Sequence, residues 1–282
     1  MDISSIERLI GKEAAEAGLA KEAAAAFAAA AEAGRVLLGF AKEGFDVGFK
    51  GVIDLVTDAD VASESAIVSR LQEIEGVPIL AEESAKDLAM PSGRFWLVDP
   101  LDGTTNFAHG FPFYAASIAL CKMDRQEGYQ TLVGIVYLPR LEEFFWAVKG
   151  RGAWLNDRKI GVSKEARLDR SLLATGFPYD VHERPDDIVA ALKALLVRAQ
   201  GIRRAGAAAI DLAYVAAGRF EGFWEKRLKP WDTAAGQLLV EEAGGWLSDF
   251  GGRRYHPFLK EIVASNGHIH EEMVSVLADF SG

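Results

Sequence analysis

The chain has 282 residues, half of them hydrophobic, and a formal net charge of −10 at pH 7. This length suits one large or two small α/β domains with a sizeable core. The negative charge argues against a nucleic-acid surface, but not against a phosphorylated substrate, because bound cations outweigh distant surface charge. No uninterrupted apolar stretch approaches the ~20 residues of a membrane span, and the N-terminus lacks the apolar core of a secretory signal. The single cysteine, Cys121, cannot form an internal disulfide, which fits a reducing cytoplasm.

The first hundred residues predict helices followed by two short strands that end in carboxylates. The alanine-rich segment 14–41 predicts one or two helices, because alanine is the best helix former. Apolar residues at near-helical spacing in 61–74 predict another helix, which Asp58 or Asp60 would start. The apolar runs 77–81 and 95–98 predict buried strands.

The rest of the chain first predicts a mixed or antiparallel sheet and then an alternation of strands and helices. Strands are expected at 115–121, 132–138, 144–148, 172–175, 220–225, 246–249 and 261–264, and a turn followed by a strand at 150–156. Helices are expected at 186–199, 207–217, 231–243 and 268–278. No linker is long enough to separate independent domains, so the expectation is one α/β domain over 1–282, with halves of about 1–160 and 161–282.

Acidic side chains recur at strand ends and helix starts. These carboxylates are Asp60, Glu82 with Glu83, Asp99 with Asp102, and Asp232. Carboxylate oxygens are hard ligands that suit Mg²⁺. Asp102 is placed to cap a short helix whose first N–H groups, at Gly103, Thr104 and Thr105, would attract phosphate.

Each carboxylate also has a purely structural interpretation. Asp60 and Asp232 stand where an aspartate caps a helix or complements its dipole. Adjacent residues of a strand point to opposite faces, so one of Glu82 and Glu83 is expected to bind metal and the other to be structural. Asp99 on its own closes a turn before Pro100.

The sequence motifs favour a functional role for these carboxylates. The string Trp-Leu-Val-Asp-Pro-Leu-Asp-Gly-Thr-Thr-Asn at 96–106 resembles the signature of the inositol monophosphatase family of metal-dependent phosphatases. The Trp-Asp-Thr-Ala-Ala-Gly string at 231–236 resembles the second signature of that family. Further matching segments follow in the family's order, at 54–60, 82–84, 206–209 and 222–225. The resemblance therefore covers nearly the whole chain beyond the first ten or so residues.

The resemblance implies a layered αβαβα sandwich, a homodimer and a Mg²⁺-dependent, Li⁺-sensitive phosphatase. It implies that Glu82, Asp99 and the carbonyl of Leu101 hold one Mg²⁺, and that Asp99, Asp102 and Asp232 hold a second. A third, weaker ion would rest mainly on Glu82. Mn²⁺ is an alternative ion, and Li⁺ and Ca²⁺ are expected to inhibit. Carboxylates that each bind two metal ions can hold the ions at the separation found in two-metal phosphatases.

The same resemblance assigns the remaining catalytic and phosphate contacts. Thr104, hydrogen-bonded to Asp60, would orient the attacking water, and Glu82 would share in catalysis. The amides of Gly103, Thr104 and Thr105 would bind the phosphate oxygens.

Substrate recognition is expected around a glycine-led turn and a strand-end carboxylate. The residues implied are Gly206, Ala207, Ala208 and Glu225, together with Asp102 and Asp232. Relatives often carry Ser or Thr at position 207, so Ala207 removes one side-chain contact. Lys50 is either a solvated lysine or a neighbour of the site. Arg203 and Arg204 are interpreted first as surface or dimer residues, and second as attractors of another phosphate.

The expected function is hydrolysis of inositol monophosphate by a cytoplasmic, Mg²⁺-dependent phosphomonoesterase. The alternative substrates are fructose 1,6-bisphosphate, NADP, histidinol phosphate and 3′-phosphoadenosine 5′-phosphate. The alternative from another class is a non-catalytic interaction protein on the same fold. No nucleic-acid partner and no membrane are expected.

Overall fold

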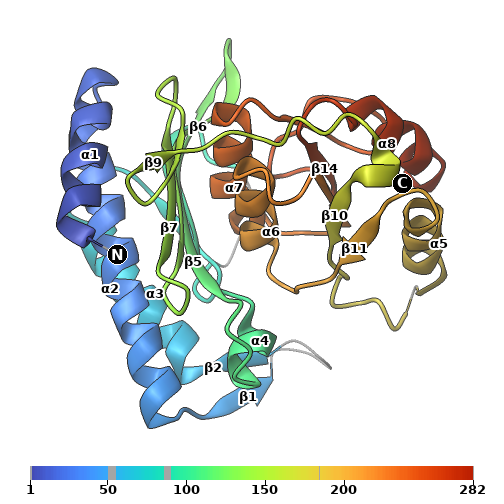
Figure 1. Ribbon diagram of the computed structural model, residues 1–282. Helices are drawn as coiled ribbons and strands as arrows, with labels where there is room; N and C mark the ends of the chain where they lie inside the picture. The colour runs from blue at the N-terminus through green and yellow to red at the C-terminus, as the bar shows by residue number, and fades with distance from the viewer. Residues whose placement is uncertain (1, 50–54, 86–89, 184, 282) are drawn as a thin grey trace.

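The computed structural model describes residues 2–49, 55–85, 90–183 and 185–281. Lys50 and Asp54, singled out in the sequence, lie outside these ranges. Two β-sheets alternate with three layers of helices, so that the order through the molecule is αβαβα (Figure 1). The layered sandwich expected from the sequence is therefore confirmed.

The outer helical layer at the N-terminus comprises three helices. They are α1 (Ile3–Glu16), α2 (Ala20–Glu43) and α3 (Asp58–Leu71). The alanine-rich segment thus forms parts of two helices, and its small residues allow close packing: a Cβ on Gly34 would lie 2.1 Å from the ring of Tyr137 in the sheet. Phe27 of α2 also packs on Phe144 of the sheet, with ring centroids 5.2 Å apart.

Within the described part of the chain, one helix is long and apolar enough to cross a membrane, judged by length and composition alone. This helix is α2, with 24 residues and a mean hydropathy of 1.4 over its most apolar window. Half of that window is buried inside the protein. The apolar character of α2 therefore serves the core between the N-terminal helices and the first sheet.

The first sheet has seven strands in the order β3-β4-β5-β6-β7-β8-β9. Its strands are β3 (Ile79–Ala81), β4 (Gly93–Asp102), β5 (Ala115–Asp124), β6 (Gly128–Leu138), β7 (Glu143–Val148), β8 (Ala153–Leu155) and β9 (Arg158–Lys159). Only β3 and β4 are parallel, so their carboxyl ends, which carry Glu82 and Asp99, meet at one edge. A separate antiparallel pair, β1 (Val47–Phe49) and β2 (Leu55–Thr57), leads into α3.

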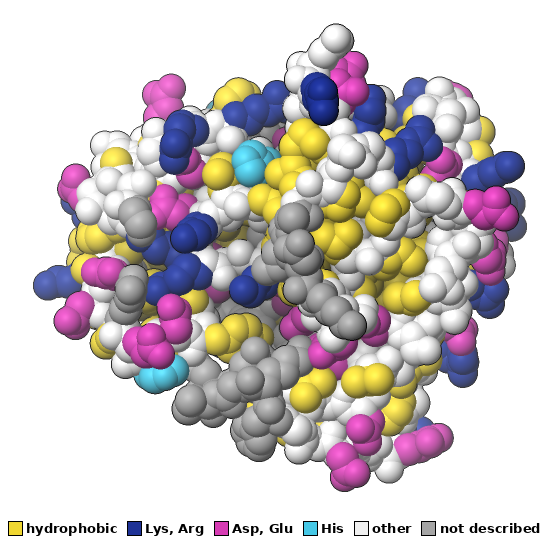
Figure 2. Space-filling model, turned by 180° about the vertical axis from the view of Figure 1, so that it is seen from behind, with side chains coloured by type: hydrophobic (Ala, Val, Ile, Leu, Met, Phe, Trp, Pro, Cys, Tyr) yellow, Lys and Arg dark blue, Asp and Glu magenta, His cyan; other side chains and the backbone are white. Residues whose placement is uncertain are grey.

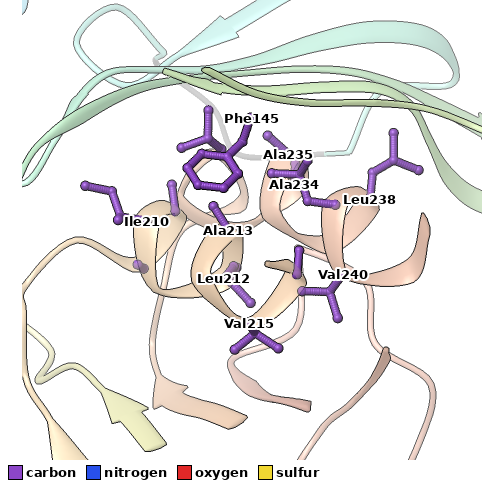
Figure 3. Close-up of a cluster of buried hydrophobic side chains, with 14 of the residues drawn as sticks. Phe145, Ile210, Leu212, Ala213, Val215, Ala234, Ala235, Leu238 and Val240 are labelled. Atoms are coloured by element: carbon purple, nitrogen blue, oxygen red, sulfur yellow. The ribbon is translucent and has the colours of Figure 1, made fainter. Parts of the chain in front are cut away.

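The middle layer holds α6 (Ala208–Ala216) and α7 (Pro230–Glu242), which lie side by side under the first sheet (Figure 3). Their apolar side chains form one buried cluster with Phe145 of β7. A Cβ on Gly236 would stand 2.5 Å from the Cβ of Leu212, so α6 approaches α7 closely only because residue 236 is glycine. The small residues of the second signature thus bring the start of α7 to the sheet.

The second sheet has five strands in the order β11-β10-β12-β14-β13. Its strands are β10 (Leu172–Thr175), β11 (Gly201–Arg203), β12 (Gly222–Lys226), β13 (Trp246–Ser248) and β14 (Glu261–Ser265). The outer helices α5 (Pro185–Leu196) and α8 (His270–Leu277) cover its far face with a third apolar cluster. Figure 2 shows the molecule from behind. Around the edge of this face, Lys and Arg side chains are interspersed with Asp and Glu side chains, so neither sign of charge dominates.

One local prediction was wrong. Asp102 does not cap the short helix α4 (Thr104–Ala108), because Gly103 takes the N-cap position in the left-handed conformation, with φ of 90°, and no side chain caps the helix. Both aspartates instead belong to the irregular end of β4, where the pairing with β5 shifts between Asp99 and Asp102. The carboxylate of Asp102 is consequently free to bond elsewhere.

Candidate active site

A pocket of about 270 Å³ opens where the two sheets and the middle helices meet. It contains the carboxyl ends of β4 and β12 and the amino ends of α6 and α7. The structure brings together in it every predicted site residue except Asp60: Glu82, Asp99, Leu101, Asp102, Gly103, Thr104, Thr105, Gly206, Ala207, Ala208, Glu225 and Asp232. Predicted residues from five separate segments of the sequence thus share one cavity.

The turn between Asp99 and Thr104 is held by its own polar groups. The carboxylate oxygen Oδ1 of Asp99 accepts the N–H of Leu101 at 3.0 Å, and the hydroxyl of Thr104 lies 3.0 Å from the carbonyl oxygen of Leu101. A Cβ on Gly103 would stand 2.9 Å from the carbonyl oxygen of Phe113. Only glycine combines that close approach with a positive φ, which explains the residue type at this point of the signature.

Asp60 does not line the pocket, but each of its carboxylate oxygens bonds a neighbouring group. As the third residue of α3 it accepts the N–H of Thr57 at 2.7 Å through Oδ2, which completes a capping box. Its other oxygen, Oδ1, accepts the hydroxyl of Thr104 at 2.9 Å. Asp60 is therefore both a helix cap and the partner of the threonine that lines the pocket.

Two further helix starts hold the other aspartates. Asp102 Oδ2 accepts the N–H of Ala209 at 2.8 Å, at the amino end of α6. Asp232 Oδ2 accepts the N–H of Lys229 at 2.7 Å, at the amino end of α7. These N–H groups and helix dipoles favour the charged carboxylates, and the capping interpretation of Asp232 holds alongside its place in the pocket.

The two adjacent glutamates after β3, Glu82 and Glu83, lie in different surroundings. Glu82 lines the pocket. Glu83 does not line it, and its backbone N–H donates to Glu64 Oε2 at 2.8 Å.

Burial and mutual repulsion make the pocket costly for negative charge. Burial first, and then the nearby Glu82, raise the pKa of both Asp99 and Asp232 well above the ordinary value for aspartate. Burial also raises the pKa of Asp102 to about 7, although the N–H groups of α6 oppose this shift. A divalent cation would relieve this repulsion, since hard oxygen ligands of this kind bind Mg²⁺.

The carboxylate oxygens of the pocket are therefore ligands of the chemical type that binds a divalent metal. In residues 2–49, 55–85, 90–183 and 185–281, no three His, Cys, Asp or Glu side chains converge closely enough to hold a metal ion as they stand. The carboxylates surround the cavity rather than a single point. A bound ion would place positive charge directly among these carboxylates, in a pocket that Arg204, Arg227 and Lys229 also line.

A further acidic group lines the pocket near the end of β12. Glu225 is 7% exposed, and burial raises its pKa to about 8, while the cationic Arg204 lowers it. A Cβ on Gly176 would stand 2.0 Å from a carboxylate oxygen of Glu225, so this carboxylate fits only because residue 176 is glycine. Asp211 lies nearby, and burial and repulsion by Glu225 raise its pKa well above the usual range.

Sequence reasoning missed Gly176 and Asp211, and it interpreted Arg204 as an attractor of phosphate only in second place. Arg204, first interpreted as a surface or dimer residue, lines the pocket with its guanidinium 5.2 Å from the ring of Phe177. Its position two residues before the Gly206 turn was the available signal. Gly176 and Asp211 carry no motif that could have revealed them.

These features define a phosphatase-type site built on an αβαβα sandwich. The sequence model of the inositol monophosphatase family matches residues 19–280, and the chain belongs to this family. It is 41% identical over 257 residues to a protein of Neisseria meningitidis named putative Nus factor SuhB, covering 90% of this chain and 96% of that one. It is 43% identical over 226 residues to an inositol-1-monophosphatase of Synechocystis, covering 80% and 77%.

A solved structure agrees with these sequence matches. The extragenic suppressor protein SuhB of Bartonella henselae superposes with a TM-score of 0.80 at 42% identity, covering 88% of this chain and 95% of that one. The family is one of metal-dependent phosphatases, so the class of chemistry expected from the signatures is confirmed.

Proposed function

We propose that this protein is a Mg²⁺-dependent phosphomonoesterase that hydrolyses inositol monophosphate to inositol and phosphate. The observation that carries the proposal is the gathering of Glu82, Asp99, Asp102 and Asp232 in one pocket together with Glu225. The first four carboxylates suit a cation that binds phosphate, and the fifth suits the hydroxyl groups of a polyol. The Synechocystis relative, named an inositol-1-monophosphatase, supports the choice of substrate.

In this proposal the acidic residues divide into two sets of metal ligands. Glu82, Asp99 and the carbonyl of Leu101 would hold one Mg²⁺, and Asp99, Asp102 and Asp232 would hold a second. When bound, the metal supplies a Lewis acid that activates water and neutralises the charge of the leaving alkoxide. Mn²⁺ is the alternative ion, and Li⁺ and Ca²⁺ are the expected inhibitors.

Thr104 and Asp60 would position the attacking water and handle its proton. The hydroxyl of Thr104 lies 2.9 Å from Asp60 Oδ1, so it can accept a proton from water while its own proton passes toward that carboxylate. The water oxygen forms the new bond to phosphorus as the bond from phosphorus to the inositol oxygen breaks. No covalent phospho-enzyme is required.

The remaining pocket residues would bind the two ends of the substrate. The amides of Gly103, Thr104 and Thr105 would take the phosphate oxygens, where charge spreads in the transition state. The turn Gly206, Ala207 and Ala208 would present backbone groups to the inositol ring. Glu225 would accept hydrogen bonds from adjacent hydroxyls, with Asp102 and Asp232 completing this side.

The experiment that tests the substrate measures phosphate release from a panel of monoesters. The panel comprises inositol 1-phosphate, fructose 1,6-bisphosphate, NADP, histidinol phosphate and 3′-phosphoadenosine 5′-phosphate. Each is measured with Mg²⁺, with EDTA and with added Li⁺. The proposal expects Mg²⁺-dependent, Li⁺-sensitive release that is fastest on inositol 1-phosphate. Faster release from another ester would keep the mechanism and replace the substrate.

A second candidate is a non-catalytic interaction role, which the relative named putative Nus factor SuhB favours. Asp99→Asn separates the two functions, because it should abolish phosphate release while leaving a surface for partners intact. A cytoplasmic homodimer is the assembly that we propose for either role. The net charge of −10 is the argument against a direct nucleic-acid partner.

A further inference from the structure

One face of α3 carries three buried polar side chains in succession. Asp60, Ser63 and Glu64 are 1%, 0% and 7% exposed. Residues three and four positions apart share a face of an α-helix, so all three point the same way. The same helix continues with buried Ile67 and Leu71, which are apolar. The polar residues are thus confined to the part of the helix that approaches the pocket.

Ser63 and Glu64 each bond the backbone of a segment that carries a proposed metal ligand. The hydroxyl of Ser63 donates to the carbonyl of Pro100 at 2.8 Å, and Pro100 lies between Asp99 and Leu101. Glu64 Oε2 accepts the N–H of Glu83 at 2.8 Å, directly after Glu82. Neither side chain lines the pocket, so neither touches the substrate or the reacting atoms.

The burial of the Glu64 carboxylate points to a specific role, because burying a charged group destabilises the folded protein. Burying a charged or polar group costs free energy unless hydrogen bonds compensate for it. An apolar side chain at position 64 would avoid that cost, as Ile67 does one turn later. The carboxylate instead fixes the turn after β3, while Ser63 fixes the turn at the end of β4. One helix thereby bonds both segments, which the parallel pairing of β3 with β4 also joins.

We propose that Ser63 and Glu64 are positioning residues that hold the Glu82 turn and the Asp99–Leu101 turn at the separation required for metal binding. The inference rests on the proposed function. Together with Asp60, which bonds Thr104, they make one face of α3 the support of three catalytic segments. Outer partners of this kind typically change metal affinity by about 10- to 100-fold when they are removed.

The test compares Ser63→Ala and Glu64→Ala with Glu64→Gln and a matched control. Ser65→Ala is the control, because Ser65 is an exposed serine of the same helix and loses the same hydroxyl. Glu64→Gln keeps an oxygen that can accept the N–H of Glu83, so it should rescue most of the loss. Ser63→Ala removes one atom from a small side chain, so it decides the question even if Glu64→Ala does not fold.

The main readout is the dissociation constant of Mn²⁺ for the protein alone, measured by calorimetry without substrate. We expect it to rise about 10-fold or more in Ser63→Ala and Glu64→Ala, and to stay unchanged in Ser65→Ala. The Mg²⁺ concentration for half-maximal activity should rise in parallel. The KM for inositol 1-phosphate at saturating Mg²⁺ should not change.

Three results would overturn the inference. If Ser63→Ala lowers the melting temperature but binds Mn²⁺ as the wild type does, its hydroxyl only stabilises the fold. If both alanine variants match the wild type in Mn²⁺ affinity while the wild type releases phosphate, the inference fails and the proposed function stands. A wild-type protein that neither binds Mn²⁺ nor releases phosphate from any ester would overturn both.

Discussion

The carboxylate of Asp102 accepts the backbone N–H of Ala209 at 2.8 Å, which joins the last residue of β4 to the first turn of α6. Asn106 adds a second tie nearby, since its side-chain amide donates to the carbonyls of Phe113 at 2.7 Å and Ala205 at 2.8 Å. The pocket is therefore assembled from both halves of the chain. A substitution that breaks one of these contacts should therefore alter the pocket.

The first prediction concerns the charge of Asp102. Asp102→Asn keeps the size of the side chain but removes a negative charge from the proposed metal-binding pocket. We expect kcat/KM for inositol 1-phosphate to fall by at least about 10²-fold, the loss typical when a group that stabilises transition-state charge is removed. Asp157→Asn, at an exposed turn, is the control and should behave as the wild type. Equal activity of the two variants would contradict the assignment of Asp102.

The second prediction concerns the hydroxyl of Thr104. Thr104→Val should lower kcat by about 10²-fold, in the range for loss of a positioned proton-transfer group, with a smaller effect on KM. Thr104→Ser should retain most of the activity because it keeps the oxygen that bonds Asp60. Steady-state kinetics of the pair measure this difference. A valine variant as active as the serine variant would show that the hydroxyl has no part in the reaction.

The third prediction concerns stability in acid. The ring of His270 is buried between the hydroxyls of Ser265 and Ser248, each 2.9 Å from one ring nitrogen. Burial lowers the pKa of His270 from 6.5 to about 4. Between about pH 4 and pH 6.5, His270 therefore binds a proton in the unfolded chain but not in the folded chain. Stability linked to His270 should be complete above about pH 6.5 and fall by up to about 3 kcal/mol as the pH drops to 4.

Urea unfolding of the wild type and His270→Gln at pH 7 and pH 4.5 measures this linkage. The comparison of the two proteins isolates His270 from the buried carboxylates, whose raised pKa values act in the opposite direction. The loss on acidification should be smaller in His270→Gln. His268→Gln, two residues away and exposed, should retain the wild-type loss. If all three proteins lose the same free energy, His270 does not stay neutral in the folded state.

The fourth prediction concerns Cys121. Its thiol is fully buried, lies 3.0 Å from the hydroxyl of Tyr129, and has a pKa raised to about 12 by burial. Since the thiolate is the reactive form, the folded protein should not react with iodoacetamide at pH 8. One alkylated cysteine per chain should appear in denaturant, as mass spectrometry would record. Rapid labelling of the folded protein would contradict the burial.

The layered sandwich and the residues that line the pocket were expected from the resemblance to the family, whereas most helices and strands were expected from local patterns. Periodicity placed most helices and strands within a few residues, and both signatures indicated residues that meet in the pocket. The strands β1, β2, β9 and β11 were not predicted. Each has two or three residues, too few for an alternating pattern to stand out.

The wrong cap at Asp102 illustrates what sequence alone could not provide. An aspartate before Gly-Thr-Thr has the local features of an N-cap, but its partner is Ala209, 107 residues along the chain. The left-handed Gly103 separates Asp102 from α4. Gly176 and Glu64 escaped notice for the same reason, because their significance lies in contacts across the fold.

The measurement that tests the central claim most directly is phosphate release from inositol 1-phosphate by the wild type and by Asp99→Asn, each with Mg²⁺ and with EDTA. Asp99 is 3% exposed and stands in both proposed ligand sets. We predict activity only in the wild type with Mg²⁺, and restoration of that activity when excess Mg²⁺ follows EDTA. Full activity of Asp99→Asn, or release that persists in EDTA, would contradict the metal-dependent mechanism.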